Sequence, residues 1–153
     1  MNKYEILRAD MIAALKSGNK FRKLTLSDII ATIDKTATAG KTRVEITDAF
    51  VDEVLIKYEK TVQEMISTCP DTEKYATQKQ EYIDKLNIVQ EYAPKVIEDI
   101  NEIKKMINLW SCGNQIAIVN QNKGIIMKSV MPWLKQNHCD MKMAQIAIKE
   151  MLN

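Results

Sequence analysis

Glycine and proline are scarce in this chain of 153 residues, which contains four glycines and three prolines. Sandwiches and barrels of many short strands need such turn residues at frequent intervals, so the scarcity argues against those folds. Lysine, glutamate, isoleucine, leucine and methionine are abundant instead, and this composition favours helices. Hydrophobic residues make up 46% of the chain and charged residues 27%, which is enough apolar material for a core. The composition therefore predicts one compact helical domain or two very small ones.

Histidines and paired cysteines, which most metal and catalytic sites need, are few as well. His138 is the one histidine, and the three cysteines are widely spaced without a CxxC pair. A thiol, an imidazole and a carboxylate do occur together in the segment 137–140, but neighbours in a loop seldom align for nucleophile–base chemistry. We interpret this segment as a loop that closes one helix and caps the next. The sequence thus assigns no catalytic residue, no metal site and no cofactor.

Recognised nucleotide-binding and hydrolase motifs are absent too. The chain has no glycine-rich phosphate loop, no HExxH, no GxSxG and no EF-hand loop. No apolar run approaches the roughly 18 residues that a membrane span needs, and the amphipathic start has no signal-peptide core. We therefore expect a soluble cytoplasmic protein that does not act at a membrane.

Apolar residues recur every three or four positions along most of the chain, which predicts helices. In the first half we expect four, at about residues 2–17, 24–38, 48–68 and 71–92. Thr25, with Asp28 three residues later, is expected to cap the second helix. The pair Cys69-Pro70 breaks the pattern after the third helix, and the pair Asp71-Thr72 is expected to cap the fourth. Two long helices joined by a tight proline turn predict an antiparallel hairpin.

The best position for a domain boundary is Ala93, because a residue that precedes proline is displaced from helical geometry. We expect an N-terminal helical domain at 1–93 and a C-terminal helical domain at 94–153. Further helices are expected at about 97–111, 123–136 and 141–152, with Asn122 and Asp140 as caps of the last two. The apolar piece 116–119 suits either a helix or a strand. The predicted fold class is all-α: a helical N-terminal part with a long antiparallel helix hairpin, followed by a small helical C-terminal bundle.

The net charge of +2 is unevenly distributed. Residues 1–43 carry nine Lys/Arg against four Asp/Glu, residues 44–94 five against eleven, and residues 95–153 eight against five. This distribution predicts basic and acidic regions on one molecule rather than a uniformly basic nucleic-acid binder.

Lysines repeat at seven-residue spacing on the last two predicted helices, and one more stands where the first of these helices begins. These candidates for binding RNA are Lys123, Lys128, Lys135, Lys142 and Lys149. Residues seven apart share one face of a helix, so these lysines can contact phosphates in a salt-dependent way. Trp133 stands beside them and suits either stacking on a base or filling a small core. A solvated polar face is the alternative interpretation. A second, denser basic cluster comprises Lys16, Lys20, Arg22 and Lys23.

The segment from Gly124 to Lys135, GIIMKSVMPWLK, resembles the C-terminal signature of the GatB/YqeY family, Gly-x-Val-Met-Gly-x-Val-Met-Pro-x-Val-Lys. The last predicted helix, the Tyr92-Ala93-Pro94 hinge and the basic turn 20–23 fit the same family. The resemblance covers nearly the whole chain and is strongest over residues 123–152. The chain departs from the family pattern by having Lys128 in place of the second glycine, as a divergent cellular or phage-encoded relative would.

The resemblance implies a YqeY-like, non-catalytic accessory module. Its C-terminal domain resembles the tail of the amidotransferase B subunit, which engages tRNA during amidation of misacylated glutamyl- or aspartyl-tRNA. The resemblance also brings a carbon–nitrogen ligase label, with glutamine as amido donor, but we find no site for ATP phosphates in this chain and therefore interpret the label as inherited from the amidotransferase. We therefore expect tRNA as the partner. The alternative is a structural or protein-interaction module without RNA binding, in which the acidic hairpin of residues 47–92 or the methionine-rich C-terminal faces bind a protein.

Overall fold

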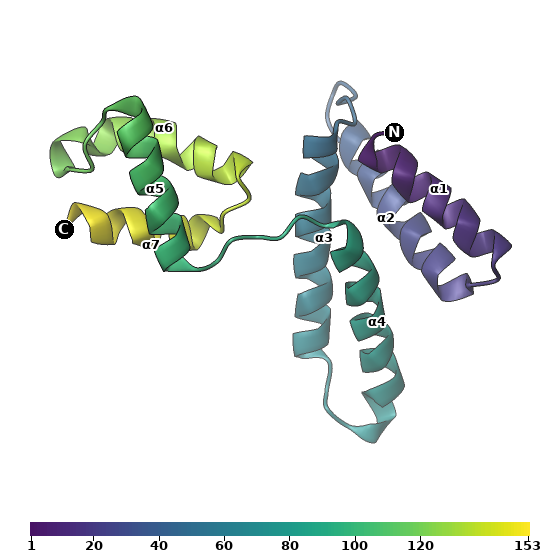
Figure 1. Ribbon diagram of the computed structural model, residues 1–153. Coiled ribbons are helices and arrows are strands. Elements are labelled where there is room, and N and C mark those ends of the chain that lie inside the picture. Colours follow the sequence, from purple (N-terminus) through teal and green to yellow (C-terminus); the bar gives the residue numbers. More distant parts are fainter. The chain divides into compact units, whose positions relative to one another are not determined.

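The computed structural model describes all 153 residues as seven α-helices and two short 3-10 turns, without a named strand (Figure 1). The prediction of an all-α fold is therefore confirmed. The chain divides into two compact units, Met1–Pro94 and Lys95–Asn153. Each unit buries its own cluster of apolar side chains, so each has a core of its own.

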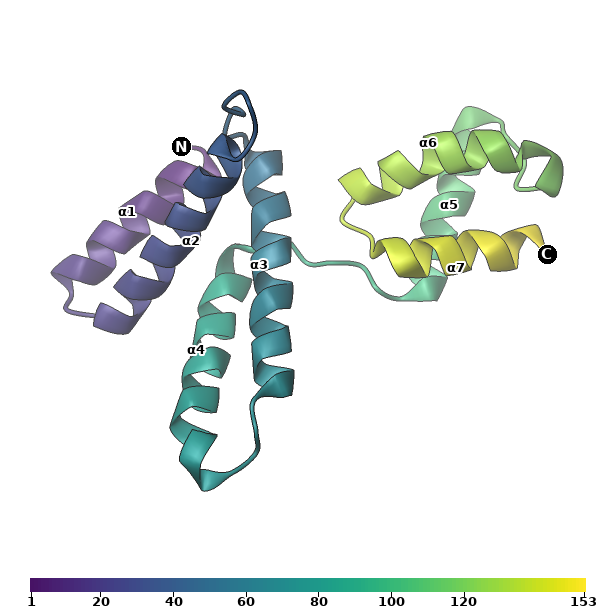
Figure 2. The same cartoon turned by 180° about the vertical axis from the view of Figure 1, so that it is seen from behind.

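The N-terminal unit contains four helices, α1 (Lys3–Lys16), α2 (Lys20–Thr38), α3 (Asp48–Thr68) and α4 (Ala76–Tyr92), and a 3-10 turn, η1 (Glu73–Tyr75), precedes α4. Helix α1 lies beside α2, and α3 lies beside α4, as both views of the ribbon show (Figures 1 and 2). Asn2 and Glu5 form a capping box at the start of α1. The Thr47 side chain accepts a hydrogen bond from the N–H of Phe50 and caps α3.

Two of the expected caps in this unit are wrong. Helix α2 begins at Lys20 rather than near residue 24, because the Asn19 side chain accepts the N–H of Arg22 at 3.1 Å and caps it there. Thr25 is consequently a buried residue inside the helix. Asp71 does not cap α4, since its carboxylate lies 3.6 Å from the ammonium of Lys79 and α4 begins without a side-chain cap.

The core of the N-terminal unit gathers side chains from all four helices. Its buried members are Leu7, Leu26, Ile29, Ile30, Ile33, Val51, Val54, Leu55, Ile88 and Val89. Helix α3 contributes through its first two turns and α4 through its last two, so this core holds one end of the hairpin. Burial of each large aliphatic side chain contributes roughly 1.5–3 kcal/mol relative to exposure in water. The other end of the hairpin projects beyond α1 and α2 (Figures 1 and 2).

A polar network joins the last turn of α4 to α1 and α2. The Arg22 guanidinium donates hydrogen bonds to both carboxylate oxygens of Glu91, at 3.1 and 2.6 Å, and a third to the Tyr92 hydroxyl at 2.9 Å. That hydroxyl donates to Asp10 at 2.6 Å. Burial and the hydrogen bond to Asp10 raise the pKa of Tyr92 to about 12, while the bond from Arg22 lowers the pKa of Glu91. The network thus adds polar contacts among three helices at the edge of the apolar core, against which Tyr92 also packs.

The C-terminal unit contains α5 (Ile100–Asn114), α6 (Lys123–Gln136) and α7 (Met141–Leu152), with a 3-10 turn, η2 (Asn120–Asn122), before α6. Helix α7 contacts both α5 and α6. The buried side chains between the three helices include Ile103, Ile107, Ile126, Val130, Leu134, Ala144, Ala147 and Ile148. The chain enters this unit through Ile97, whose N–H donates to the carbonyl of His138 at 2.9 Å and whose carbonyl accepts from Asp140 at 2.8 Å.

The predicted helix starts of this unit have mixed outcomes. Asp140 caps α7 as expected, accepting a hydrogen bond from the N–H of Met143 at 3.0 Å. Asn122 does not cap α6, because its side-chain amide donates to the carbonyl of Ala117 instead. The segment 116–119 is neither helix nor strand, although Ile116 and Ile118 pack against the core. The helix expected at 97–111 begins three residues later, at Ile100, because Asp99 caps it.

Tyr92→Phe is expected to lower the free energy of unfolding by about 1–2 kcal/mol, because the partly buried Asp10 and Arg22 each lose a hydrogen-bond partner. Urea denaturation followed by circular dichroism measures the loss. Tyr75→Phe is the matched control, since the Tyr75 hydroxyl makes no hydrogen bond within the chain. Equal stability of the two variants would contradict the role of the network.

The stability contributed by Glu91 is expected to depend on pH. Its pKa is lowered in the folded chain, so its contribution is present above the ordinary range of a carboxyl group and is lost as pH falls through the lowered value. Because the side chain is half exposed, Glu91→Gln is expected to lower stability by only about 0.5 kcal/mol at neutral pH. This difference from wild type is expected to disappear in acid, whereas Glu45→Gln, which removes no ion pair, shows no difference at either pH.

Candidate nucleic-acid interface

Of the two units, the C-terminal one has a net positive charge. It carries eight lysines against five acidic residues. The five lysines singled out in the sequence, Lys123, Lys128, Lys135, Lys142 and Lys149, are all exposed, and none of them forms an ion pair. Glu150, the acidic residue on α7, is engaged by Lys104 at 2.6 Å instead. The five ammonium groups therefore face solvent without a carboxylate partner.

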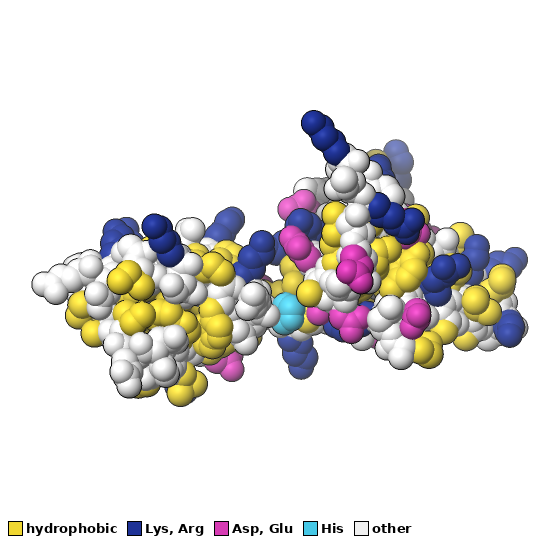
Figure 3. All heavy atoms as spheres, turned by 90° about the horizontal axis from the view of Figure 1, so that it is seen from above, with side chains coloured by type: hydrophobic (Ala, Val, Ile, Leu, Met, Phe, Trp, Pro, Cys, Tyr) yellow, Lys and Arg dark blue, Asp and Glu magenta, His cyan; other side chains and the backbone are white.

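The helical repeat places these lysines in two pairs on the solvent side of α6 and α7. On α6, Lys128 and Lys135 lie opposite the buried side chain of Val130. On α7, Lys142 and Lys149 lie across the helix from the buried Ala144. Lys123 is the first residue of α6. On the face of this unit seen in Figure 3, basic side chains lie along one edge, next to a surface with many apolar atoms.

Unlike the five lysines, Trp133 is not an exposed residue. It is half-buried and packs against the core of the C-terminal unit. Its neighbour Pro132 lies inside α6 and lacks the N–H that would continue the helical hydrogen bonding, yet the helix runs on to Gln136. Stacking of Trp133 on a base would use only the part of the ring that the core leaves exposed.

The second basic cluster, at the turn between α1 and α2, is partly committed to structure. Arg22 is held by Glu91 and Tyr92 in the network described above. Lys16 and Lys20 are exposed and form no ion pair. Within this cluster, Lys16 and Lys20 are therefore free to meet a phosphate, whereas Lys23 is half-buried.

The segment 137–140 is a structural loop, as its interpretation from sequence supposed. Cys139 is 5% exposed, and its Sγ lies 3.7 Å from the Sδ of Met106. Burial, together with the charge of Glu102, raises the pKa of the Cys139 thiol, whereas an activated nucleophile needs a lowered one. Asp140 is used as the cap of α7. No group of three or more side chains that could hold a metal ion is found, and no helix is long and apolar enough to cross a membrane.

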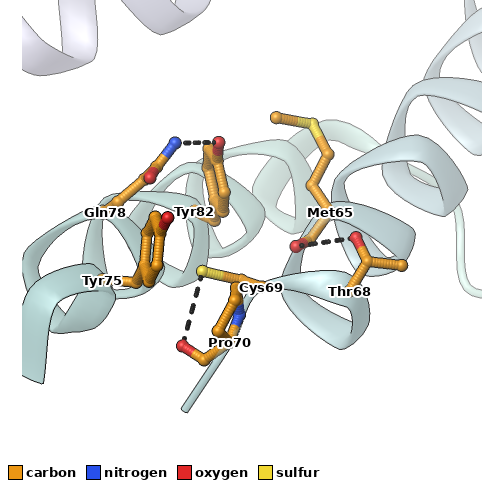
Figure 4. A pocket seen from close by; sticks show the side chains of 7 residues that line it. All are labelled: Met65, Thr68, Cys69, Pro70, Tyr75, Gln78 and Tyr82. Carbon is orange, nitrogen blue, oxygen red and sulfur yellow. Dashed lines mark hydrogen bonds between the residues drawn. The ribbon is translucent and has the colours of Figure 1, made fainter. Parts of the chain in front are cut away.

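The tip of the α3–α4 hairpin holds an open hollow of about 290 Å³ that sequence reasoning missed (Figure 4). Its lining residues are Met65, Thr68, Cys69, Pro70, Tyr75, Gln78 and Tyr82. Tyr75 lies in η1 and Tyr82 in α4, seven residues apart, and both rings line the hollow. Their spacing is compatible with a shared face, but no pattern in the sequence shows that the core ends before this tip.

Comparison with known proteins defines the family. A search of curated proteins gave no match to the chain. A family model described as Yqey-like protein matches residues 4–152, which is nearly the whole chain and includes both compact units. The two-unit helical structure that carries the exposed lysines therefore belongs to the family of Yqey-like proteins.

Proposed function

We propose that this protein is a non-catalytic accessory module that binds the phosphate backbone of tRNA and assists tRNA-dependent amidation. The observation that carries the proposal is the set of five exposed, unpaired lysines in a unit with a net positive charge. The choice of tRNA follows from the resemblance to the tail of the amidotransferase B subunit. Lys128 stands where the family signature has a glycine, so this chain carries one cation more than the signature does.

The basic residues of the C-terminal unit are lysines, and this favours contacts with phosphates over specific hydrogen bonds to bases. All three arginines of the chain lie within its first 43 residues, so the C-terminal unit has lysines alone. Arginine supplies a planar fork for bidentate contacts, whereas a lysine acts as a compact point charge. An interface of lysines therefore positions RNA through its backbone and selects by shape more than by base sequence.

Electrostatic binding of this kind has a definite dependence on salt. Each phosphate neutralised contributes a slope of about −0.7 to −0.9 to the dependence of log K on log salt. For five contacts, the affinity for tRNA is expected to fall about 100- to 500-fold between about 50 and about 200 mM salt. The combined change of Lys128, Lys135, Lys142 and Lys149 to Glu is expected to reduce the slope by about 3 and to abolish saturable binding at physiological salt.

A titration of the purified chain with bulk tRNA and with an unrelated duplex RNA, read by fluorescence anisotropy, tests this proposal. The matched control changes four exposed lysines of the N-terminal unit, Lys16, Lys20, Lys35 and Lys41, to Glu. The control is expected to keep tRNA binding, and circular dichroism confirms that both variants fold. Loss of binding in the control alone would move the interface to the first two helices.

The alternative function is a structural or protein-interaction module. It predicts that neither the wild type nor the variant with the four C-terminal lysines changed binds tRNA. That result would refute the proposal and leave the lysines as a solvated face.

A further inference from the structure

The hollow at the tip of the α3–α4 hairpin lies outside the core of its unit. Val62 is the last buried residue of α3, and Ile88 is the first buried residue of α4. No residue between them, from 63 to 87, is buried. The tip thus presents half-buried apolar and aromatic side chains that its own unit does not cover. Covering such surface would add stabilisation of roughly 25 cal/mol per Å² removed from water.

The lining of the hollow is neutral and mixed in character. Figure 4 shows the rings of Tyr75 and Tyr82 on one side and Met65 on the other, with Cys69 between them. The Gln78 amide donates to the Tyr82 hydroxyl at 2.6 Å, which leaves the Gln78 carbonyl free to accept. Tyrosine combines a large apolar contact with a polar handle, and methionine adapts to irregular shapes, so both are frequent in protein-binding sites.

The charge around the hollow is negative. The segment 64–82 contains four carboxylates, Glu64, Asp71, Glu73 and Glu81, against two lysines. Lys79 pairs with Asp71 at 3.6 Å, and the exposed ammonium of Lys74 lies 5.5 Å from the centre of the Tyr75 ring. The carboxylates of Glu64, Glu73 and Glu81 form no ion pair, so the segment keeps a net negative charge that disfavours RNA there.

We infer that this hollow is a docking site for a partner protein that presents a lysine- or arginine-rich segment with one apolar or aromatic side chain. That side chain would insert between Met65, Tyr75 and Tyr82, and its basic neighbours would meet Glu64, Glu73 and Glu81. The volume of about 290 Å³ lies just below the roughly 300–1,000 Å³ typical of ligand pockets, which suits one inserted side chain better than a cofactor. This inference is independent of the proposed tRNA site, which uses other residues of opposite charge.

Selection of a random twelve-residue peptide library on the whole chain tests the inference. We expect the enriched peptides to share one Phe, Tyr, Trp, Leu or Met flanked by at least two Lys or Arg. Synthetic versions are expected to lose tenfold or more in affinity on Tyr82→Ala and on Tyr75→Ala, by fluorescence anisotropy, because a central aromatic contact dominates such interfaces. Tyr82→Phe is expected to retain most of the affinity, and Glu73→Lys to weaken binding severalfold.

Leu24→Ala is the matched control, because Leu24 is a large exposed side chain on α2 and lies away from the tip. It is expected to leave peptide binding unchanged. Tyr75 belongs to the exposed turn η1, so Tyr75→Ala remains informative if Tyr82→Ala unfolds. Four results would each overturn the inference: no enriched peptide, peptides that are acidic or lack an apolar residue, binding that survives both tyrosine variants, or displacement of the peptide by tRNA.

Discussion

Burial of one end of α3 is the constraint on which the N-terminal unit depends. Val51, Val54 and Leu55 share a core with α1, α2 and the end of α4, so these turns are fixed from several sides. Val62 is the last buried residue of α3, and no residue of this helix beyond Leu55 belongs to that core. A hairpin held at only one end has to project, and its projecting end keeps apolar side chains partly in water.

The end of α4 is held by polar groups as well as by the core. Ile88 and Val89 are its buried residues, and they join the core of the N-terminal unit. Arg22, Glu91, Tyr92 and Asp10 add specificity through hydrogen bonds among α1, α2 and α4. Further along the hairpin, Asp28 accepts hydrogen bonds from Tyr58 and Lys85, which hold the pKa of that carboxyl below its usual range although burial alone would raise it. In the N-terminal unit, these charged groups thus stabilise the packing of the helices.

The C-terminal unit uses its charges differently. Its core of aliphatic side chains is complete without them, and the lysines of α6 and α7 stand on the opposite sides of their helices. The chain therefore carries two surfaces of opposite character: unpaired lysines in one unit, and a neutral hollow among carboxylates in the other. Partners of opposite charge suit the two surfaces, so binding at one need not compete with binding at the other.

The sequence by itself determined the features whose causes lie within a few residues. Apolar periodicity predicted the helices, Asp140 was identified as a cap because its partner is three residues away, and seven-residue spacing placed each lysine pair on one face. Only the tertiary structure decided which of these faces are covered and which charges are used. Arg22 finds Glu91 at a separation of 69 residues, and Tyr82 lies in a hollow because the core ends before the hairpin does. Such outcomes depend on how whole helices pack, which no local pattern specifies.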